Sequence, residues 1–408
     1  MAGAPSQVAG DGHRATDPAA DTLAIYVHWP FCVSKCPYCD FNSHVAEAID
    51  QPAWRAAYLR EIEDAARALA GRTVTSVFFG GGTPSLMAPD TAAAILEKLR
   101  SLWPDTAWET VEITLEANPN SAEAQRFAAF RAAGVNRLSL GVQALDDSAL
   151  GFLGRAHSAA EALAALRTAR AHFGRINADM IYARPGQSEA AWRDELARLM
   201  AEGLSHLSLY QLTIERGTPF FARHRRGEFA LPGADAEARL YEVTGEVLGA
   251  AGLEAYEVSN YARPGAECRH NLTYWRYGDF AGFGPGAHGR LTGPDGTVAT
   301  ENIRNPRDWI AAVEARASGR KSDTPLTPDE RAAEMLLMGL RLARGVDEAR
   351  FEAVTGGTFA DRIAPGRLKR LIDAGYLTYE DGRLRASEAG RLRLDAVIGA
   401  LLPDARPD

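Results

Sequence analysis

The sequence predicts an α/β fold in which a parallel sheet, curved into a partial or complete barrel, carries its helices on the outside. Apolar, β-branched segments alternate with amphipathic helical segments six times in succession. Most of the helical segments are closely followed by a glycine suited to end a helix. Six such units in a row are typical of parallel strands connected by helices. An open doubly wound sheet is the alternative that the same pattern allows.

The predicted strands are short runs rich in Val, Ile and Leu, and they are Leu23–Trp29, Val74–Phe79, Val111–Leu115, Arg137–Val142, Ile176–Tyr182 and Leu207–Ile214. The predicted helices fill the gaps between them, at Pro52–Leu69, Asp90–Leu102, Ala122–Ala133, Ala159–His172, Glu189–Ala201 and Asp235–Ala251. We therefore expect residues 22–252 to form the barrel.

The rest of the chain does not follow this alternation. Residues 1–21, rich in Ala, Gly, Asp and Pro, are expected to form a disordered tail, and residues 253–324 a segment that links or caps the barrel. Residues 325–408 are mostly helical in pattern, with one hairpin signal at the step Asp381-Gly382. We expect a small α+β domain there, similar to a winged helix.

The composition is that of a soluble globular protein and argues against nucleic-acid binding. The chain has 408 residues, 46% of them apolar and 24% charged, with a net charge of -8, as in a soluble globular protein of two or three domains. Arginine supplies nearly all of the positive charge, because lysine occurs only at positions 35, 98, 321 and 369. No basic cluster suited to nucleic acid is present.

The expected location is a reducing cytosol. No stretch approaches the roughly 18 apolar residues that would cross a bilayer, and the first residues lack the apolar run of a signal peptide. Any membrane contact is therefore expected to be peripheral. Four cysteines, three of them within eight residues, do not resemble a secreted disulfide framework.

Those three cysteines, Cys32, Cys36 and Cys39, follow the first predicted strand directly. Three thiolates on one short loop can occupy three corners of an iron–sulfur cube and leave the fourth iron open. On a barrel, the loop would lie at the carboxyl ends of the strands, where sites are normally built. Two alternatives remain: ordinary cysteines, or a structural zinc site whose fourth ligand is His28, His44 or Cys268.

The spacing C-x3-C-x2-C resembles the hallmark of the radical SAM superfamily, and the run Tyr26–Cys32 resembles its branch containing oxygen-independent coproporphyrinogen III oxidase. The resemblance extends from about Leu23 to about Leu401. It implies a partial (β/α)6 TIM-like barrel and a [4Fe-4S] cluster held by Cys32, Cys36 and Cys39. S-adenosylmethionine (SAM) would chelate the open iron, and its reductive cleavage would give a 5′-deoxyadenosyl radical.

The resemblance also implies which residues contact SAM. The run Gly80–Ser85 looks like the motif for the SAM amino group, and Arg155 matches a position that pairs with the SAM carboxylate. The full implied set is Tyr26, Tyr38, Gly81, Gly82, Thr83, Glu116, Gln143, Arg155, Asp179 and His288. Tight turns, helix caps and a solvated arginine are the ordinary alternatives at these positions. The loop Ala183–Gln187 departs from the Gly-Leu-Pro run that is usual there.

Two features distinguish members of the branch. The oxidase has a further cysteine two places after the third, where this chain has Phe41. The run His270–Trp275 matches the HNxxYW motif of the sister group, the HemW-type heme chaperones. The match implies that His270, Tyr274 and Trp275 contact heme, because imidazole ligates heme iron and aromatic rings cover a porphyrin. Packing of the barrel against the C-terminal domain is the alternative, and Cys268 is a ligand or a structural cysteine.

The leading hypothesis is a heme chaperone that carries a [4Fe-4S] cluster and SAM and delivers heme to acceptor proteins such as membrane respiratory enzymes. The alternative is an enzyme that decarboxylates coproporphyrinogen III oxidatively to protoporphyrinogen IX. A zinc-stabilised binding module is the third hypothesis. The expected partners are heme, heme-accepting proteins and, in a homodimer, a second copy of the chain.

Overall fold

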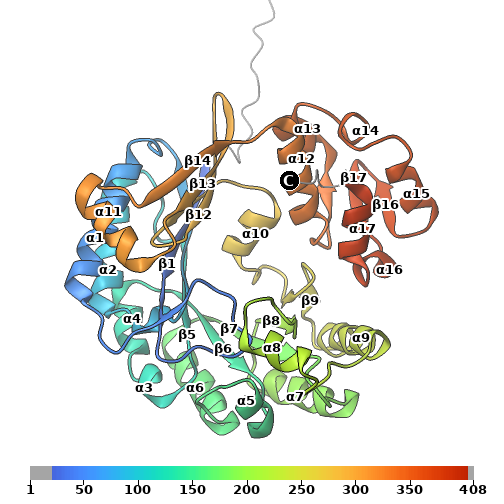
Figure 1. The fold of residues 1–408 in the computed structure, drawn as a ribbon, viewed down its shortest axis with the longest axis horizontal. Helices are drawn as coiled ribbons and strands as arrows, with labels where there is room; N and C mark the ends of the chain where they lie inside the picture. The colour runs from blue at the N-terminus through green and yellow to red at the C-terminus, as the bar shows by residue number, and fades with distance from the viewer. Residues whose placement is uncertain (1–20, 403–408) are drawn as a thin grey trace, which may run out of the picture.

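The computed structural model describes residues 21–402, and its central element is a twisted sheet in which six parallel strands lie side by side in chain order (Figure 1). These strands are β1 (Thr22–Trp29), β4 (Thr73–Gly81), β5 (Glu112–Ala117), β6 (Arg137–Gln143), β7 (Arg175–Tyr182) and β8 (His206–Gln211). The predicted α/β fold with a curved parallel sheet is confirmed. The tail predicted for residues 1–21 falls almost entirely outside the described residues.

Helices follow the strands and form an arc around the outside of the sheet (Figure 1). The long ones are α1 (Gln51–Ala66), α2 (Pro89–Leu102), α6 (Ala159–His172), α7 (Glu189–Ala201) and α9 (Ala234–Ala250), and the short ones are α5 (Asp147–Phe152) and α8 (Pro219–Arg225). The helix predicted over Ala122–Ala133 is divided into α3 (Ser121–Ala124) and α4 (Phe127–Ala133). At the break, Arg126 donates hydrogen bonds to the carbonyl oxygens of Ser85 and Met87, which anchor the chain to the preceding strand-to-helix loop.

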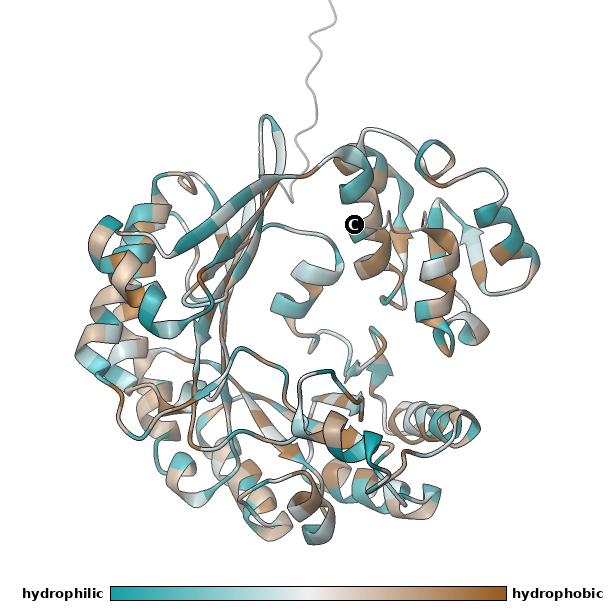
Figure 2. Cartoon of the chain, viewed as in Figure 1, coloured by the Kyte–Doolittle hydropathy of each residue, from teal (hydrophilic) through white to brown (hydrophobic). Residues whose placement is uncertain are grey.

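The two faces of the parallel sheet differ in polarity. Alternate residues such as Ile25, Leu115 and Leu140 point outward into one continuous apolar core shared with the helices. Because side chains alternate between faces along a strand, the intervening positions point inward, and many are polar, among them Glu116, Ser139 and Asp179. Figure 2 shows apolar residues recurring along both the strands and the helices, and the buried ones form this shared core. The barrel interior is therefore a polar chamber.

Residues 253–324 extend both edges of this sheet. At one edge, β10 (Asn260–Ala262) pairs antiparallel with β8 and with β9 (Glu254–Ala255). At the other, β11 (Phe280–Phe283) pairs parallel with β1 and is followed by β12 (His288–Gly293), β13 (Gly296–Asn302) and β14 (Arg320–Pro325). The order of the twelve described strands runs from β14 to β9 without closing, so the barrel is partial.

The opening between these edges contains helix α10 (Arg269–Trp275), which lies at the amino-terminal ends of the strands. Glu112, the first residue of β5, accepts hydrogen bonds from the Cys268 thiol at 3.4 Å and the His270 N–H at 3.2 Å. The helix thereby closes the bottom of the chamber, and in Figure 1 it lies inside the ring.

The C-terminal domain has its own apolar core, to which α12 (Pro328–Gly339) and α17 (Leu394–Leu401) contribute. Its other helices are α13 (Glu348–Thr355), α14 (Phe359–Arg362), α15 (Arg367–Asp373) and α16 (Glu388–Arg391). Its antiparallel sheet has the order β15 (Val346–Asp347), β17 (Arg383–Ala386), β16 (Leu377–Glu380). The hairpin predicted at Asp381-Gly382 is present, with both residues at positive φ, as a tight I′-type turn requires.

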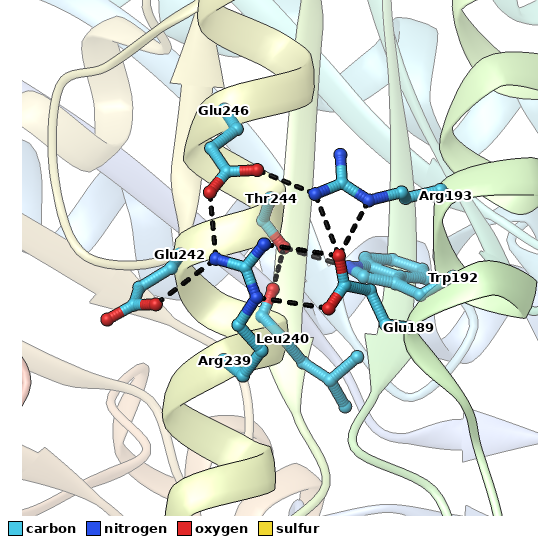
Figure 3. Close-up of polar contacts among 8 residues, drawn as sticks. All are labelled: Glu189, Trp192, Arg193, Arg239, Leu240, Glu242, Thr244 and Glu246. Atoms are coloured by element: carbon cyan, nitrogen blue, oxygen red, sulfur yellow. Dashed lines mark hydrogen bonds and ion pairs between the residues drawn. The ribbon is translucent and has the colours of Figure 1, made fainter.

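On the outer surface, α7 and α9 are joined by the ion-pair network drawn in Figure 3, in which Arg239 pairs with Glu189, Glu242 and Glu246. These groups are substantially exposed, and such pairs contribute little to stability. Below them, the buried indole of Trp192 donates a hydrogen bond of 2.8 Å to the Thr244 hydroxyl. The buried contact, rather than the surface pairs, is the stronger reason for α9 to pack on α7.

None of the helices described between residues 21 and 402 is long and apolar enough to span a membrane.

Helix α1 is joined to the β11–β14 edge through one buried carboxylate. Glu61 accepts hydrogen bonds from Gly284 N at 2.8 Å, Trp309 Nε1 at 3.0 Å and Gly319 N at 3.1 Å. Burial raises the pKa of Glu61, and these donors oppose the rise. The segment α11 (Pro306–Arg316), which carries Trp309, is thereby fixed to the barrel.

Replacement of Glu61 by Ala should lower the free energy of unfolding by about 3 kcal/mol or more, because several buried donors would lose their acceptor at once. Urea denaturation followed by circular dichroism measures the loss. Glu63→Ala is the matched control on the same helix, since Glu63 is 63% exposed and forms only a surface pair with Lys98. A similar change in both variants would contradict the structural role of Glu61.

Candidate functional site

A cavity of about 1050 Å³ opens at the carboxyl ends of the parallel strands. The last residue of each of five strands lines it, namely Gly81, Ala117, Gln143, Tyr182 and Gln211. The loop after β1 forms one wall. The segment Arg391–Ala396 of the C-terminal domain forms part of another. The cavity therefore lies where barrel proteins usually place their sites, and two parts of the chain far apart in sequence enclose it.

The three clustered cysteines all line this cavity as free, partly exposed thiols. Cys32 ends β2 (Phe31–Cys32), which pairs with β3 (His44–Val45), and these short strands hold the loop at both ends. The thiols of Cys32 and Cys36 accept hydrogen bonds from Thr83 Oγ1 at 3.4 Å and from Arg155 Nη1 at 3.3 Å, respectively. Burial raises the pKa of the Cys32 thiol.

The donor set suits an iron–sulfur cube better than a zinc ion. Among residues 21–402, no three His, Cys, Asp or Glu side chains lie close enough to hold one metal ion together. Each thiolate on a cube binds a different iron, so a cube does not require that convergence. Two of the suggested zinc ligands are also engaged elsewhere: His28 Nε2 is 2.9 Å from the Asn42 carbonyl oxygen, and Cys268 is buried at the bottom of the chamber.

The glycines at the end of β4, Gly81 and the following Gly82, let the backbone approach the cysteine loop closely. Gly82 N and Thr83 N donate hydrogen bonds to the carbonyl oxygens of Trp29 and Phe31, at 2.7 and 2.8 Å. A Cβ on Gly82 would lie 2.7 Å from the Phe31 oxygen, and Gly81 has a φ of +114°. Glycine is therefore required here, and the run fixes the strand that leads into the cysteine loop.

Two carboxyl groups, those of Glu116 and Asp179, line the deeper part of the cavity. Glu116 Oε2 accepts a hydrogen bond of 3.2 Å from Gly81 N, and Asp179 accepts one of 3.0 Å from the Ser139 hydroxyl. Burial first, and the charge of Asp179 second, raise the pKa of Glu116 to about 8. Burial also raises the pKa of Asp179. A cationic ligand placed between them would relieve this repulsion.

Arg155 and Gln143 form the opposite wall. Arg155 Nη2 donates to Asn118 Oδ1 at 2.6 Å and to the Gly141 carbonyl oxygen at 3.0 Å, while its buried Nε has no partner. This unpaired donor fits a ligand carboxylate, which accepts from a guanidinium at two atoms. Gln143 has a φ of +67°, which turns the chain sharply at the end of β6.

The remaining residues of the expected SAM set are distributed unevenly. Tyr38 lines the main cavity beside Arg155, and burial raises its pKa. Tyr26 lies lower in the chamber, in a second cavity of about 190 Å³ to which Glu116 and Asp179 also contribute. His288 is exposed on β12 and does not line either cavity. The cysteines, Gly81, Gly82, Thr83, Glu116, Gln143, Arg155 and Asp179 are thus brought together.

The residues expected to contact heme lie at the bottom of the chamber. His270 Nδ1 is 2.9 Å from the Ser76 hydroxyl, and its Nε2 is 2.6 Å from the Tyr274 hydroxyl, so both ring nitrogens are engaged. Burial lowers the pKa of His270 to about 3, which keeps the ring neutral. Trp275 faces the C-terminal domain, with the Arg341 guanidinium 4.7 Å from its ring centre. In this structure the motif joins the two parts of the chain.

Sequence reasoning missed several residues of the cavity wall. Tyr210 stands near the end of β8, and this strand-end position could have identified it. Asn118 follows Glu116 closely and could have been found in the same way. No local pattern marks the wall segment Arg391–Ala396, because its place depends on how the C-terminal domain docks.

Comparison with known proteins agrees with this architecture. The model of the radical SAM superfamily matches residues 26–200, and that of the HemN C-terminal domain matches residues 326–393. The chain is 38% identical to heme chaperone HemW of Mycobacterium tuberculosis, over 93% of this chain and 95% of that protein. It is 37% identical to heme chaperone HemW of Escherichia coli, over 94% and 98%.

It is also 40% identical to the mitochondrial radical S-adenosyl methionine domain-containing protein 1 of Bos taurus, over 96% of this chain and 90% of that protein. Among solved structures, coproporphyrinogen III oxidase (HemN) from Escherichia coli has the same fold, with a TM-score of 0.76 at 23% identity over 96% and 92% of the two chains. The chain therefore belongs to the radical SAM superfamily, in its HemN/HemW-like family.

Stability should depend on pH through Glu116. A carboxyl whose pKa rises to about 8 on folding stabilises the folded state fully below its unfolded value near 4.5. That contribution is lost as pH rises to about 8. Relative to Glu116→Gln, the free energy of unfolding of the wild type should fall by up to about 1.4 kcal/mol per pH unit within this window. Urea denaturation of both proteins at several pH values measures the difference. If the free energies of unfolding of the two proteins changed with pH in the same way, the raised pKa of Glu116 would be contradicted.

Replacement of Cys36 by Ala should prevent stable cluster assembly, because one of three thiolate ligands is lost. Iron and sulfide analysis after anaerobic reconstitution, together with the visible absorption spectrum, measures the outcome. Cys268→Ala is the matched control, since this thiol lies at the other end of the chamber and should leave the iron content unchanged. An unaltered spectrum in the Cys36 variant would refute the assignment.

Proposed function

We propose that this protein is a heme chaperone that binds heme, carries a [4Fe-4S] cluster and SAM, and transfers heme to acceptor proteins such as membrane respiratory enzymes. The observation that carries the proposal is the large cavity between the cysteine loop and the C-terminal domain. A volume of about 1050 Å³ is at the upper end for ligand pockets. The relatives named heme chaperone HemW support the same function.

In this proposal Cys32, Cys36 and Cys39 hold the cluster at the mouth of the barrel. Arg155 receives the SAM carboxylate through its unpaired Nε, and Gln143 lies on the same wall. Glu116 and Asp179 balance the positive charge of SAM deeper in the chamber. When bound, the cluster and SAM supply one-electron chemistry. The chain's own contribution is to orient them and to limit the access of water.

Heme would occupy the wider part of the cavity, towards the C-terminal domain. Tyr210, Tyr241 and Leu392 offer ring and aliphatic surface there, and Leu392 is 37% exposed although it lines the cavity. Arg391 has a buried Nε without a partner and lies beside the Tyr241 hydroxyl. A guanidinium in this place suits the propionate carboxylates of heme.

The assignment of His270, Tyr274 and Trp275 to heme binding is part of the proposal. For His270 to ligate heme iron, Nδ1 or Nε2 would have to give up its bond to Ser76 or Tyr274. A cavity of about 190 Å³ around the ring would also have to join the larger one. Glu116, Asp179 and Tyr210 line both cavities, which makes such a connection short.

Titration of the purified full-length protein with hemin should give a shifted Soret band and heme that remains bound through gel filtration. Arg391→Ala should weaken hemin binding about tenfold or more, because a charge-assisted hydrogen bond contributes about 1.5–3 kcal/mol. Lys369→Ala is the matched control, since Lys369 is 76% exposed on α15 and pairs only with Asp373. Light scattering of the same samples gives the molar mass and so tests the homodimer expected from the sequence.

Absence of a Soret shift in the wild type would reject the proposal that the protein is a heme chaperone. Equal affinities of the two variants would reject only the placement of the propionates at Arg391.

A parallel anaerobic assay with reduced cluster, SAM and coproporphyrinogen III tests the oxidase reaction. At the position of the oxidase's additional cysteine, this chain has Phe41, which is 64% exposed and lines the cavity. We expect no protoporphyrinogen in that assay.

A further inference from the structure

Asn118, just beyond the end of β5, connects two walls of the cavity through its side-chain amide. Its Oδ1 accepts a hydrogen bond of 2.6 Å from Arg155 Nη2, and its Nδ2 donates one of 3.4 Å to Thr83 Oγ1. Each of these two neighbours in turn donates to a cysteine. Thr83 Oγ1 donates to Cys32 Sγ at 3.4 Å, and Arg155 Nη1 donates to Cys36 Sγ at 3.3 Å. One amide is therefore bonded both to a residue that donates to Cys32 and to a residue that donates to Cys36.

The orientation of this amide is fixed by Glu123 of α3. Glu123 is 5% exposed and accepts Asn118 N at 2.8 Å and Asn118 Nδ2 at 3.1 Å. The carboxylate also accepts bonds from the Ser85 hydroxyl and from Asn120 Nδ2. A carboxylate only accepts and a guanidinium only donates. The amide nitrogen must therefore face Glu123 and the amide oxygen must face Arg155.

The third cysteine lies outside this network. Cys39 Sγ has a contact of 3.8 Å with the Ser43 hydroxyl, which belongs to the same loop. The network thus acts on two of the three sulfurs and links them to the ends of β4 and β5.

We propose that Asn118, oriented by Glu123, is a positioning residue that sets the hydrogen bonds to Cys32 and Cys36 and thereby raises the reduction potential of the cluster that these cysteines hold. The inference rests on the cluster in the proposed function and extends it. Hydrogen bonds to ligand sulfurs withdraw electron density and favour the reduced cluster. Groups beyond the ligands commonly tune metal sites in this way.

The test uses full-length Asn118→Ala, reconstituted anaerobically beside the wild type. Iron and sulfide content is measured first, and the midpoint potential is then found by redox titration with electron paramagnetic resonance. The variant should contain the wild-type amount of iron and should have a more negative midpoint potential with altered g values. Thr83→Val should shift the potential in the same direction, because it removes the bond to Cys32, together with the bond that Thr83 Oγ1 accepts from Asn118, and nearly keeps the side-chain shape.

Asn305→Ala is the matched control, since Asn305 caps α11 and lies outside the network of Asn118, Glu123, Thr83 and Arg155. Its potential should equal that of the wild type. Unchanged potentials in cluster-loaded Asn118→Ala and Thr83→Val would overturn the inference while leaving the proposed cluster intact. Wild-type protein without iron and sulfide would overturn both, and the metal analysis reveals this before any potential is measured. If Asn118→Ala does not assemble a cluster, the Thr83→Val potential alone decides.

Discussion

The site depends on a close backbone contact between the first two parallel strands at their carboxyl ends. Hydrogen bonds from Gly82 N to Trp29 O and from Thr83 N to Phe31 O hold the start of the cysteine loop against β4. A side chain on Gly82 would collide with the Phe31 carbonyl group. Because this contact fixes where the loop leaves the sheet, it also fixes the side of the cavity on which the three thiols lie.

The chamber beneath this contact is polar because the strands place their apolar residues on the helix side. The inward side chains then satisfy one another, as when Ser139, Asn177 and Asp179 form hydrogen bonds across β6 and β7. Burial first, and the neighbouring charge of Asp179 second, raise the pKa of Glu116, so a cation bound beside these two carboxyl groups would be favoured. A barrel with an apolar interior would provide no such preference.

Much of this could be predicted from sequence, since strands, helices and the cysteine loop are determined by local periodicity and spacing. The break between α3 and α4 could not be predicted in this way, because it coincides with the bonds of Arg126 to a loop about 40 residues away. The position of His270 at the bottom of the chamber, bonded to Ser76 and Tyr274, depends on how α10 folds back into the ring. The wall at Arg391–Ala396 depends on the docking of a separate domain and has no local signal.

That domain meets the barrel without joining its sheet. Among the described residues, the backbone pairing between them is the single bridge Glu257–Leu342, supported by the ion pair of Arg341 with Glu257. Side chains provide the rest of the attachment, among them Glu334, which accepts from Arg290 at 2.7 Å and from the Tyr277 hydroxyl at 2.7 Å. The shape of the cavity is therefore set by side chains on one side, at Arg391–Ala396, and by strand ends on the other.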